Sequence, residues 1–162
     1  VLSVIAGRSK ELVILENEVR QSSDELIIMT DDGSYGEKGV VTVGIEKFIT
    51  QEEHVDKVFA IGPPIMMKFC CLLTQKYNLS TDVSLNTIMV DGTGMCGACR
   101  VSVGGEVKFA CVDGPEFDGH LVDFDQAMKR QLMYKTEEGR ALLRLKEGAT
   151  HHGGCGNCGG EE

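Results

Sequence analysis

The sequence lacks several features that would indicate a particular class of protein. It has no tryptophan, three prolines and 6% aromatic residues, so aliphatic side chains and seven methionines must fill the core. No apolar run approaches the ~20 residues of a membrane-spanning helix. Lys and Arg form no cluster and the net charge is −9. We therefore expect no nucleic-acid partner, because phosphate backbones are bound by clustered basic side chains.

The cysteine content indicates the redox environment. There are seven cysteines, an odd number, and the first residues carry neither a basic region nor a cleavage-like site of a signal peptide. Disulfide frameworks are typical of secreted proteins with paired cysteines. The composition therefore favours reduced thiols in the cytoplasm, used for metal or redox chemistry.

The first half of the chain alternates apolar runs with helical patterns. Strands are predicted at 1–6, 25–30 and 57–61, and helices at 10–21, 39–50 and 66–77. The first strand is expected to be buried on both faces, and Ser9 to cap the first helix. This alternation predicts a parallel α/β sheet, in which ligands bind at the carboxyl ends of the strands.

The second half has a different pattern. A short strand is predicted at 85–90, and the alternation over 100–111 around a Gly-Gly pair predicts a β-hairpin. Residues 125–146 have helical composition with a break expected near Thr136. The tail, 149–162, is rich in Gly, Cys and His and is expected to be flexible.

Three cysteines lie among glycines in one short stretch of the second half. Cys96 and Cys99 are spaced so that both thiolates can face one metal centre, and the predicted hairpin returns Cys111 to the same place. Asp91 stands five positions before Cys96, where plant-type [2Fe–2S] proteins carry their first cysteine. The pattern predicts an iron–sulfur site with one carboxylate ligand. A zinc site is the alternative, and Thr93 or water could replace Asp91 as ligand.

Two strand ends could bind a nucleotide. Asp31 and Asp32 follow the second predicted strand, where a carboxylate can accept hydrogen bonds from ribose hydroxyls. Gly62 and Pro63 follow the third and leave room for a nicotinamide or pyrophosphate. The alternative is a pair of ordinary loops. No Gly-rich phosphate loop precedes these strands, so we expect the sequence to be a piece of a longer protein.

Five stretches carry a resemblance to a known family. They are GRS at 7–9, TDDGSYG at 30–36, AIGPPIMM at 60–67, VDGTGMCGACR at 90–100 and FACVDGP at 109–115. In them the sequence resembles the C-terminal part of the flavin and iron–sulfur electron-transfer subunits of the ferredoxin-NADP⁺ reductase superfamily. Members of this group are the electron-transfer subunits of NADH-dependent reduced ferredoxin:NADP⁺ oxidoreductase, of sulfide dehydrogenase and of dihydroorotate dehydrogenase. The gamma subunit of cytosolic hydrogenases is a further member. The dihydroorotate dehydrogenase relatives usually carry cysteine where Asp91 stands, so Asp91 points to the first two.

The resemblance implies a domain plan. The expected fold is a truncated parallel-sheet α/β domain of ferredoxin-reductase type, followed by a small β-hairpin iron–sulfur domain and C-terminal helices. We expect a partial NAD(P)-binding domain at 1–84, a [2Fe–2S] domain at 85–120, a helical segment at 121–148 and the tail at 149–162. The FAD-binding domain of the family is missing from this sequence.

The resemblance also implies site residues. The cluster ligands fall on Asp91, Cys96, Cys99 and Cys111. The contacts to NAD(H) or NADP(H) fall on Arg8, Asp31, Asp32, Gly62, Pro63 and Met66. No side chain is expected to be catalytic, because the cofactors carry the chemistry.

The expected function is electron transfer. Electrons would pass between NAD(P)H, FAD on the missing domain and the [2Fe–2S] cluster, and on to a larger partner subunit, with ferredoxin as a further partner. This piece alone is expected to be inactive as an enzyme. The alternative is a non-enzymatic metal-binding or redox-sensing module that binds no nucleotide.

Overall fold

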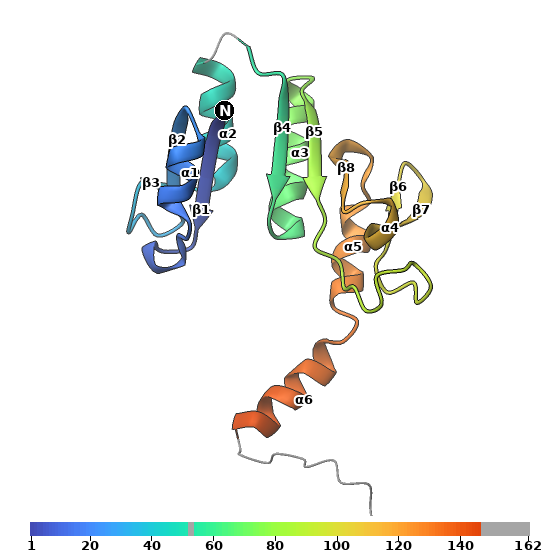
Figure 1. Cartoon of the computed structure of the whole chain (residues 1–162). Coiled ribbons are helices and arrows are strands. Elements are labelled where there is room, and N and C mark those ends of the chain that lie inside the picture. The colour runs from blue at the N-terminus through green and yellow to red at the C-terminus, as the bar shows by residue number, and fades with distance from the viewer. Residues whose placement is uncertain (52–53, 147–162) are drawn as a thin grey trace, which may run out of the picture. The chain divides into compact units, whose positions relative to one another are not determined.

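The computed structural model describes residues 1–51 and 54–146 (Figure 1). Contacts divide the chain into two compact units, Val1–Met128 and Lys129–Glu162. The first unit contains every predicted site residue up to Cys111. The predicted flexible tail lies outside the described residues.

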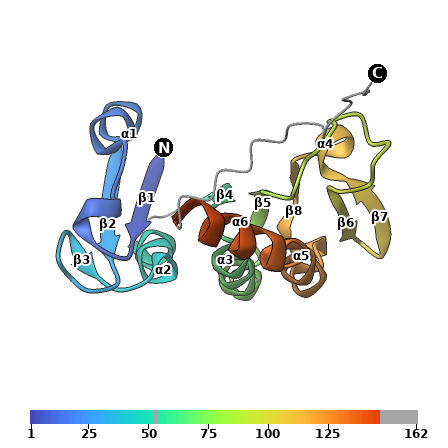
Figure 2. The ribbon, with the colours of Figure 1, turned by 90° about the horizontal axis from the view of Figure 1, so that it is seen from below.

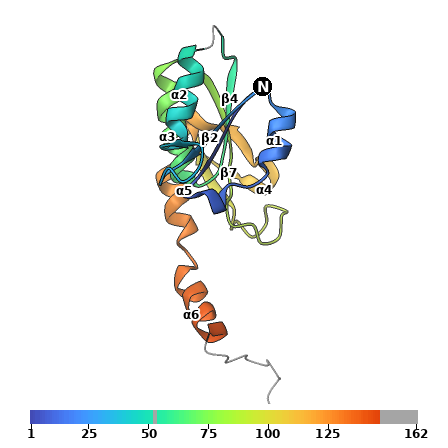
Figure 3. The same ribbon diagram turned by 90° about the vertical axis from the view of Figure 1, so that its left-hand side faces the viewer.

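Three parallel strands form the first sheet. Their order is β1 (Leu2–Gly7), β2 (Glu25–Thr30) and β3 (Glu37–Lys38). The helix α1 (Glu16–Ser22) lies on one face of this sheet and α2 (Val41–Gln51) on the other (Figures 2 and 3). Ile27, Met29 and Phe48 form the buried cluster between the sheet and α2. The predicted second strand and second helix are thus confirmed.

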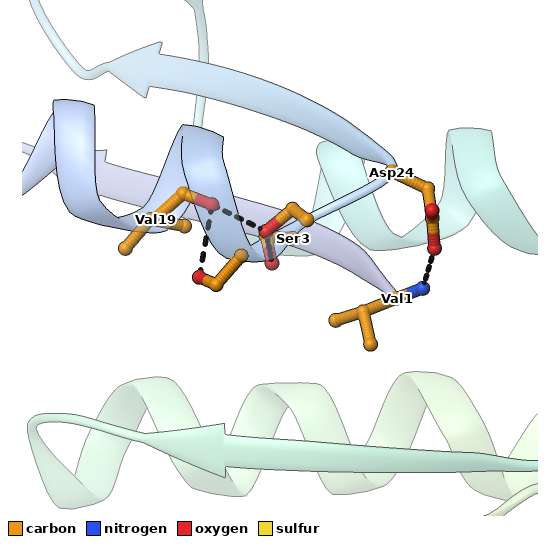
Figure 4. A network of polar contacts seen from close by, with 6 residues as sticks. Val1, Ser3, Val19 and Asp24 are labelled. Atoms are coloured by element: carbon orange, nitrogen blue, oxygen red, sulfur yellow. Dashed lines mark hydrogen bonds and ion pairs between the residues drawn. The ribbon is translucent and has the colours of Figure 1, made fainter.

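Polar contacts join β1 to the segment that precedes β2 (Figure 4). The Ser3 hydroxyl lies 2.6 Å from the Ser23 hydroxyl, which donates to the Val19 carbonyl at 2.7 Å. The Val1 amino group also contacts the Asp24 carboxylate. These contacts close the connection between α1 and β2 against the start of β1.

Two predictions about the first strand and helix were wrong. β1 is half-buried rather than buried on both faces, because the described sheet gives it one neighbouring strand, β2. In place of one helix there is a short 3₁₀ helix, η1 (Lys10–Leu12), and then α1. Leu15 between them has a left-handed backbone (φ 57°), and the Ser9 side chain makes no capping hydrogen bond. The Lys10 amide instead donates to the Ser34 hydroxyl at 2.9 Å, which holds this turn against the loop after β2.

The second sheet contains β4 (Lys57–Ile61), β5 (Ser80–Ser84) and β8 (Glu116–Asp118). β4 and β5 are parallel and β8 is antiparallel to β5. The helix α3 (Pro64–Lys76) packs on this sheet as predicted, and its buried residues include Met67, Cys70, Cys71 and Leu73. Burial raises the pKa of Cys70 to about 11 and that of Cys71 to about 12, so both are packed thiols.

The strand predicted at 85–90 was wrong, since the strand is β5 and ends at Ser84. In β5 the buried side chains are Thr81 and Val83, and this polar sequence hides the alternation. The Leu85 amide donates to the Pro115 carbonyl at 3.0 Å, after which the chain has no regular structure up to Cys96. The segment that leads to the cysteines is therefore a loop.

The predicted hairpin is confirmed. It consists of β6 (Arg100–Val103) and β7 (Glu106–Phe109), with Gly104 and Gly105 in the turn. It is followed by the short helix α4 (Ala110–Asp113), the 3₁₀ helix η2 (Gly119–Leu121) and α5 (Phe124–Gln131).

The second unit, where the structure describes it, consists of the end of α5 and the helix α6 (Lys135–Lys146). The predicted break between two helices is present, and it lies at residues 132–134, slightly before Thr136. Across the described residues, no helix is both long and apolar enough to span a membrane. The fold is the expected α/β class, although its strands form separate sheets rather than one.

Candidate metal centre

The loop from Asp91 to Cys99 is organised by the Asp91 carboxylate. Its Oδ1 accepts a hydrogen bond from the Thr93 amide at 2.8 Å, and its Oδ2 accepts one from the Cys96 amide at 3.1 Å. The Thr93 amide is the main reason that the pKa of Asp91 is lowered, with the Cys96 amide adding to it. Asp91 therefore stays ionised and connects the start of the loop to its first cysteine.

Glycines allow this loop to fold so tightly. Gly92, Gly94 and Gly97 have φ values of 78°, 82° and 65°, a left-handed backbone that residues with a Cβ rarely adopt. A Cβ at Gly94 would also lie 3.1 Å from Val112 Cγ2. These glycines thus let the backbone turn tightly between Asp91 and Cys99.

The hairpin brings two cysteines together. Its register pairs Arg100 with Phe109, so Cys99 and Cys111 lie just beyond the open ends of the two strands. Their sulfur atoms are 3.2 Å apart, and the Ala110 amide donates to the Cys99 carbonyl at 3.2 Å. Cys99 is buried and Cys111 half-buried. The neighbouring Cys99 thiol raises the pKa of Cys111, and a hydrogen bond from the Gly94 backbone opposes this shift.

Cys96, the third predicted thiol ligand, lies in the loop from Asp91 to Cys99. It is exposed, and its sulfur accepts a hydrogen bond from the Ala98 amide at 3.5 Å. In the described residues no group of three or more His, Cys, Asp or Glu side chains already has a metal-binding arrangement. The structure thus brings Cys99 and Cys111 together and connects Asp91 to the Cys96 backbone.

The donor set nevertheless fits an iron–sulfur cluster. Thiolates are the ligands that these clusters prefer, and backbone amides near the sulfurs stabilise their charge. Amides of Gly94 and Ala98 donate to Cys111 and Cys96 here. Cys96, Cys99 and Cys111 would hold the cluster, with Asp91 as the oxygen donor.

The first set of predicted nucleotide residues lies at the carboxyl ends of β1 and β2. The Asp31 amide donates to the Gly7 carbonyl at 3.1 Å and the Asp32 amide to the Arg8 carbonyl at 3.2 Å. The side chains of Arg8, Asp31 and Asp32 are all exposed. The Ser34 hydroxyl and amide, which donate to Asp32, lower its pKa. The loops after β1 and β2 thus present one cationic side chain and two carboxylates.

The second set lies where β4 runs into α3. Gly62 and Pro63 form the turn, and Met66 is in the first turn of the helix. A Cβ at Gly62 would lie 2.6 Å from Met66 Cε, so the Met66 side chain covers the glycine. The two sets of residues thus belong to different sheets.

One interaction has no signal in the sequence. His120 is half-buried, and its Nε2 lies 3.1 Å from the Thr74 hydroxyl. The two residues are 46 positions apart, and no local motif joins them. Cys155 and Cys158 in the tail lie outside the described residues.

Comparison with known proteins finds similar sequences over nearly the whole chain. Residues 86–123 match the profile of the iron–sulfur cluster binding domain of dihydroorotate dehydrogenase B. An uncharacterized protein in the adh 3′ region of Clostridium beijerinckii is 55% identical over 161 residues, which cover 98% of this chain and 54% of that protein. A dihydroorotate dehydrogenase B (NAD(+)) electron transfer subunit homolog of Thermotoga maritima is 51% identical over 138 residues, 85% of this chain and 48% of that protein.

A solved structure shows the same similarity in three dimensions. A chain of NADH-dependent reduced ferredoxin-NADP oxidoreductase, studied for flavin-based electron bifurcation, is 48% identical with a TM-score of 0.78. The match covers 89% of this chain and 51% of that one. The chain thus spans about half the length of the curated relatives it matches. Residues 86–123 thus match the iron–sulfur cluster binding domain of dihydroorotate dehydrogenase B, and the expected resemblance of the chain to ferredoxin-reductase-type electron-transfer subunits is confirmed.

Proposed function

We propose that this chain is part of the electron-transfer subunit of a flavin and iron–sulfur oxidoreductase. Electrons pass between NAD(P)H, FAD on a domain outside this sequence and a [2Fe–2S] cluster, and then reach a partner subunit. The observation that carries the proposal is the 3.2 Å approach of Cys99 and Cys111 within the segment that matches the iron–sulfur family.

The residues of this chain divide the work at the cluster. Thiolates of Cys96, Cys99 and Cys111 bind iron, and a one-electron carrier is thereby held on a glycine-rich loop. Asp91 is the fourth ligand in this proposal. Its two hydrogen bonds to loop amides are compatible with ligation, because each carboxylate oxygen has two lone pairs. Exposure of Cys96 puts this edge of the site within reach of an electron acceptor.

The strand ends hold the nucleotide in the same proposal. Arg8 pairs with a phosphate, and a carboxylate of Asp31 or Asp32 accepts from ribose hydroxyls. The nicotinamide lies next to Gly62, Pro63 and Met66, where the glycine allows the ring to approach the backbone closely. Residues 1–84 are then part of the NAD(P)-binding domain, 85–120 form the [2Fe–2S] domain, 121–148 are the helical segment and 149–162 the tail. The exposed strand ends support this assignment.

A larger partner subunit, with ferredoxin as a further partner, completes the proposed assembly. The similarity to the Thermotoga maritima electron transfer subunit homolog supports a heteromeric complex. A cytoplasmic location agrees with buried, unpaired thiols at Cys70 and Cys71.

The cluster is tested by anaerobic purification of the full-length protein, visible absorption, and iron and acid-labile sulfide analysis. We expect a coloured protein with equal amounts of iron and sulfide. Cys99→Ser should lose both, whereas the control Cys70→Ala, at a buried cysteine outside the site, should retain them. A colourless protein that contains only zinc would refute the cluster and favour the metal-binding or redox-sensing module.

The nucleotide half is tested by titration of NADH and NADPH against the same protein. Binding of one or both is expected, and Asp31→Asn should weaken it. Asp56→Asn is the control, because Asp56 is also exposed but lies before β4 and contacts His54. Absence of binding by either nucleotide would remove this half of the proposal.

A further inference from the structure

Two buried threonines form the base of a hydrogen-bond chain inside the second sheet. Thr74 on α3 and Thr81 on β5 have no exposed surface. The Thr81 hydroxyl donates to the Thr74 hydroxyl at 2.6 Å. Buried hydroxyls are costly without hydrogen bonds, so this pair requires defined partners.

His120 extends this chain of hydrogen bonds. Thr74 has one hydroxyl proton, which it donates to the Cys71 carbonyl at 3.2 Å. Its oxygen already accepts from Thr81, and one lone pair is left. His120 Nε2 lies 3.1 Å from the same oxygen, within hydrogen-bond distance.

The 3₁₀ helix η2, which carries His120, is pressed against the same core. A Cβ at Gly119 would lie 2.4 Å from Cys71 Sγ and 2.8 Å from Val83 Cγ1. This approach is possible only for glycine. η2 is thus in direct contact with both α3 and β5.

The other side of η2 holds the hairpin. The Gly104 amide in the hairpin turn donates to the Leu121 carbonyl at 2.8 Å. The Asp123 amide donates to the Ser102 carbonyl at 2.9 Å, and Val103 pairs with Val122 in a β-bridge. This hairpin is flanked by the cysteines Cys99 and Cys111. Hydrogen bonds therefore join Thr81, Thr74 and His120, and the backbone that follows His120 is hydrogen-bonded to the hairpin between two proposed cluster ligands.

We propose that His120 is a positioning residue for electron transfer. Through its hydrogen bond with Thr74 it fixes η2, and through η2 the cluster hairpin, against the sheet formed by β4 and β5. This sheet also carries Gly62, Pro63 and Met66, so the contact sets the position of the cluster relative to the bound nucleotide and flavin. The inference rests on the proposed function.

The test uses the full-length protein and measures how fast NAD(P)H reduces the cluster after rapid mixing. His120→Leu removes the ring nitrogen that is hydrogen-bonded to Thr74. Reduction of the cluster should become about tenfold slower or more, since misplacement of reacting groups by ~1 Å can cost 10²-fold in rate. Iron content, the electron paramagnetic resonance spectrum of the chemically reduced cluster and nucleotide affinity should not change. His120→Gln, which keeps a side-chain donor, should restore most of the rate.

Two further variants complete the design. Thr74→Val removes the hydroxyl that is hydrogen-bonded to His120. It should slow reduction of the cluster as much as His120→Leu does, and the double variant should be no slower than either single variant. His54→Leu is the matched control, because His54 is 78% exposed and contacts only Asp56 among the pairs described, and it should leave the rate unchanged.

The outcomes are distinguishable. An unchanged rate in His120→Leu, or a His120→Gln rate as low as that of His120→Leu, would overturn the positioning role. Loss of iron from His120→Leu would also overturn it, because the histidine would then be needed to keep the cluster rather than to position it. A wild-type protein whose cluster is not reduced by NAD(P)H would refute the proposed function itself, and with it the role of His120.

Discussion

Substitution of Gly119 by alanine tests how tightly η2 packs on the second sheet. The added Cβ would lie 2.4 Å from Cys71 Sγ and 2.8 Å from Val83 Cγ1, well inside the ~3.5–4.0 Å of ordinary carbon contacts. Both neighbours are buried and belong to regular elements, so neither can turn away freely. Overpacking of this kind costs about 1–3 kcal/mol. For a unit of this size, a loss of about 2 kcal/mol lowers Tm by roughly 4–8 °C.

The measurement is thermal and urea unfolding followed by circular dichroism. Gly139→Ala is the control of opposite sign: no atom lies within 4 Å of its added Cβ, and alanine in the middle of α6 is favoured over glycine by about 0.5–1 kcal/mol. Cys71→Ala removes the nearest atom, and in combination with Gly119→Ala it should recover about 0.5–3 kcal/mol of coupling free energy. A Gly119→Ala variant as stable as wild type, or additive effects in the double variant, would refute this packing of η2.

Three other outcomes follow from the structure. Burial raises the pKa values of Cys70 and Cys71 to about 11 and 12, so above pH ~9 the unfolded chain loses these protons before the folded protein does. The free energy of unfolding should therefore fall between pH 9 and 11, and it should fall less in Cys70→Ala. An equal fall with pH in both proteins, measured by urea unfolding, would contradict this. Met95 is 88% exposed beside Cys96, and Met95→Lys should slow electron transfer to the partner subunit without loss of iron; an unchanged rate would show that the partner does not cover this residue. Asp91→Cys should keep a [2Fe–2S] centre with a lower midpoint potential, because a thiolate donates more charge than a carboxylate; an unchanged potential in a redox titration would indicate that Asp91 does not ligate.

The secondary structure was predictable where the local pattern was unambiguous. The continuous apolar runs of β2 and β4 and the apolar face of α3 are visible in the sequence because each is a local pattern of residue type. β5 was misplaced because its buried positions include Thr81, a polar residue whose hydroxyl is satisfied by Thr74. The helix predicted at 10–21 was wrong because contacts with the loop after β2 hold Lys10 in a different turn. Tertiary contacts overrode local propensity at both places.

The candidate metal centre was predictable in its residue types but not in its geometry. Spacing in the sequence identified Asp91, Cys96, Cys99 and Cys111, and the Gly-Gly turn correctly indicated that the chain returns at Cys111. Sequence could not show that the Asp91 carboxylate binds the amides of Thr93 and Cys96. Those contacts depend on the backbone path of the loop, which the left-handed glycines set.

The sequence by itself determined the chemistry available to this protein: thiols and a carboxylate at iron–sulfur spacing, and carboxylates at a strand end. Spacing and residue type are local properties, and they survive in the sequence. Only the tertiary structure decided that His120 is hydrogen-bonded to Thr74, 46 positions away, and that η2 joins the hairpin to the sheet. A hydrogen bond of this kind depends on which groups are buried together, and burial is set by the packing of distant segments rather than by the order of residues along the chain.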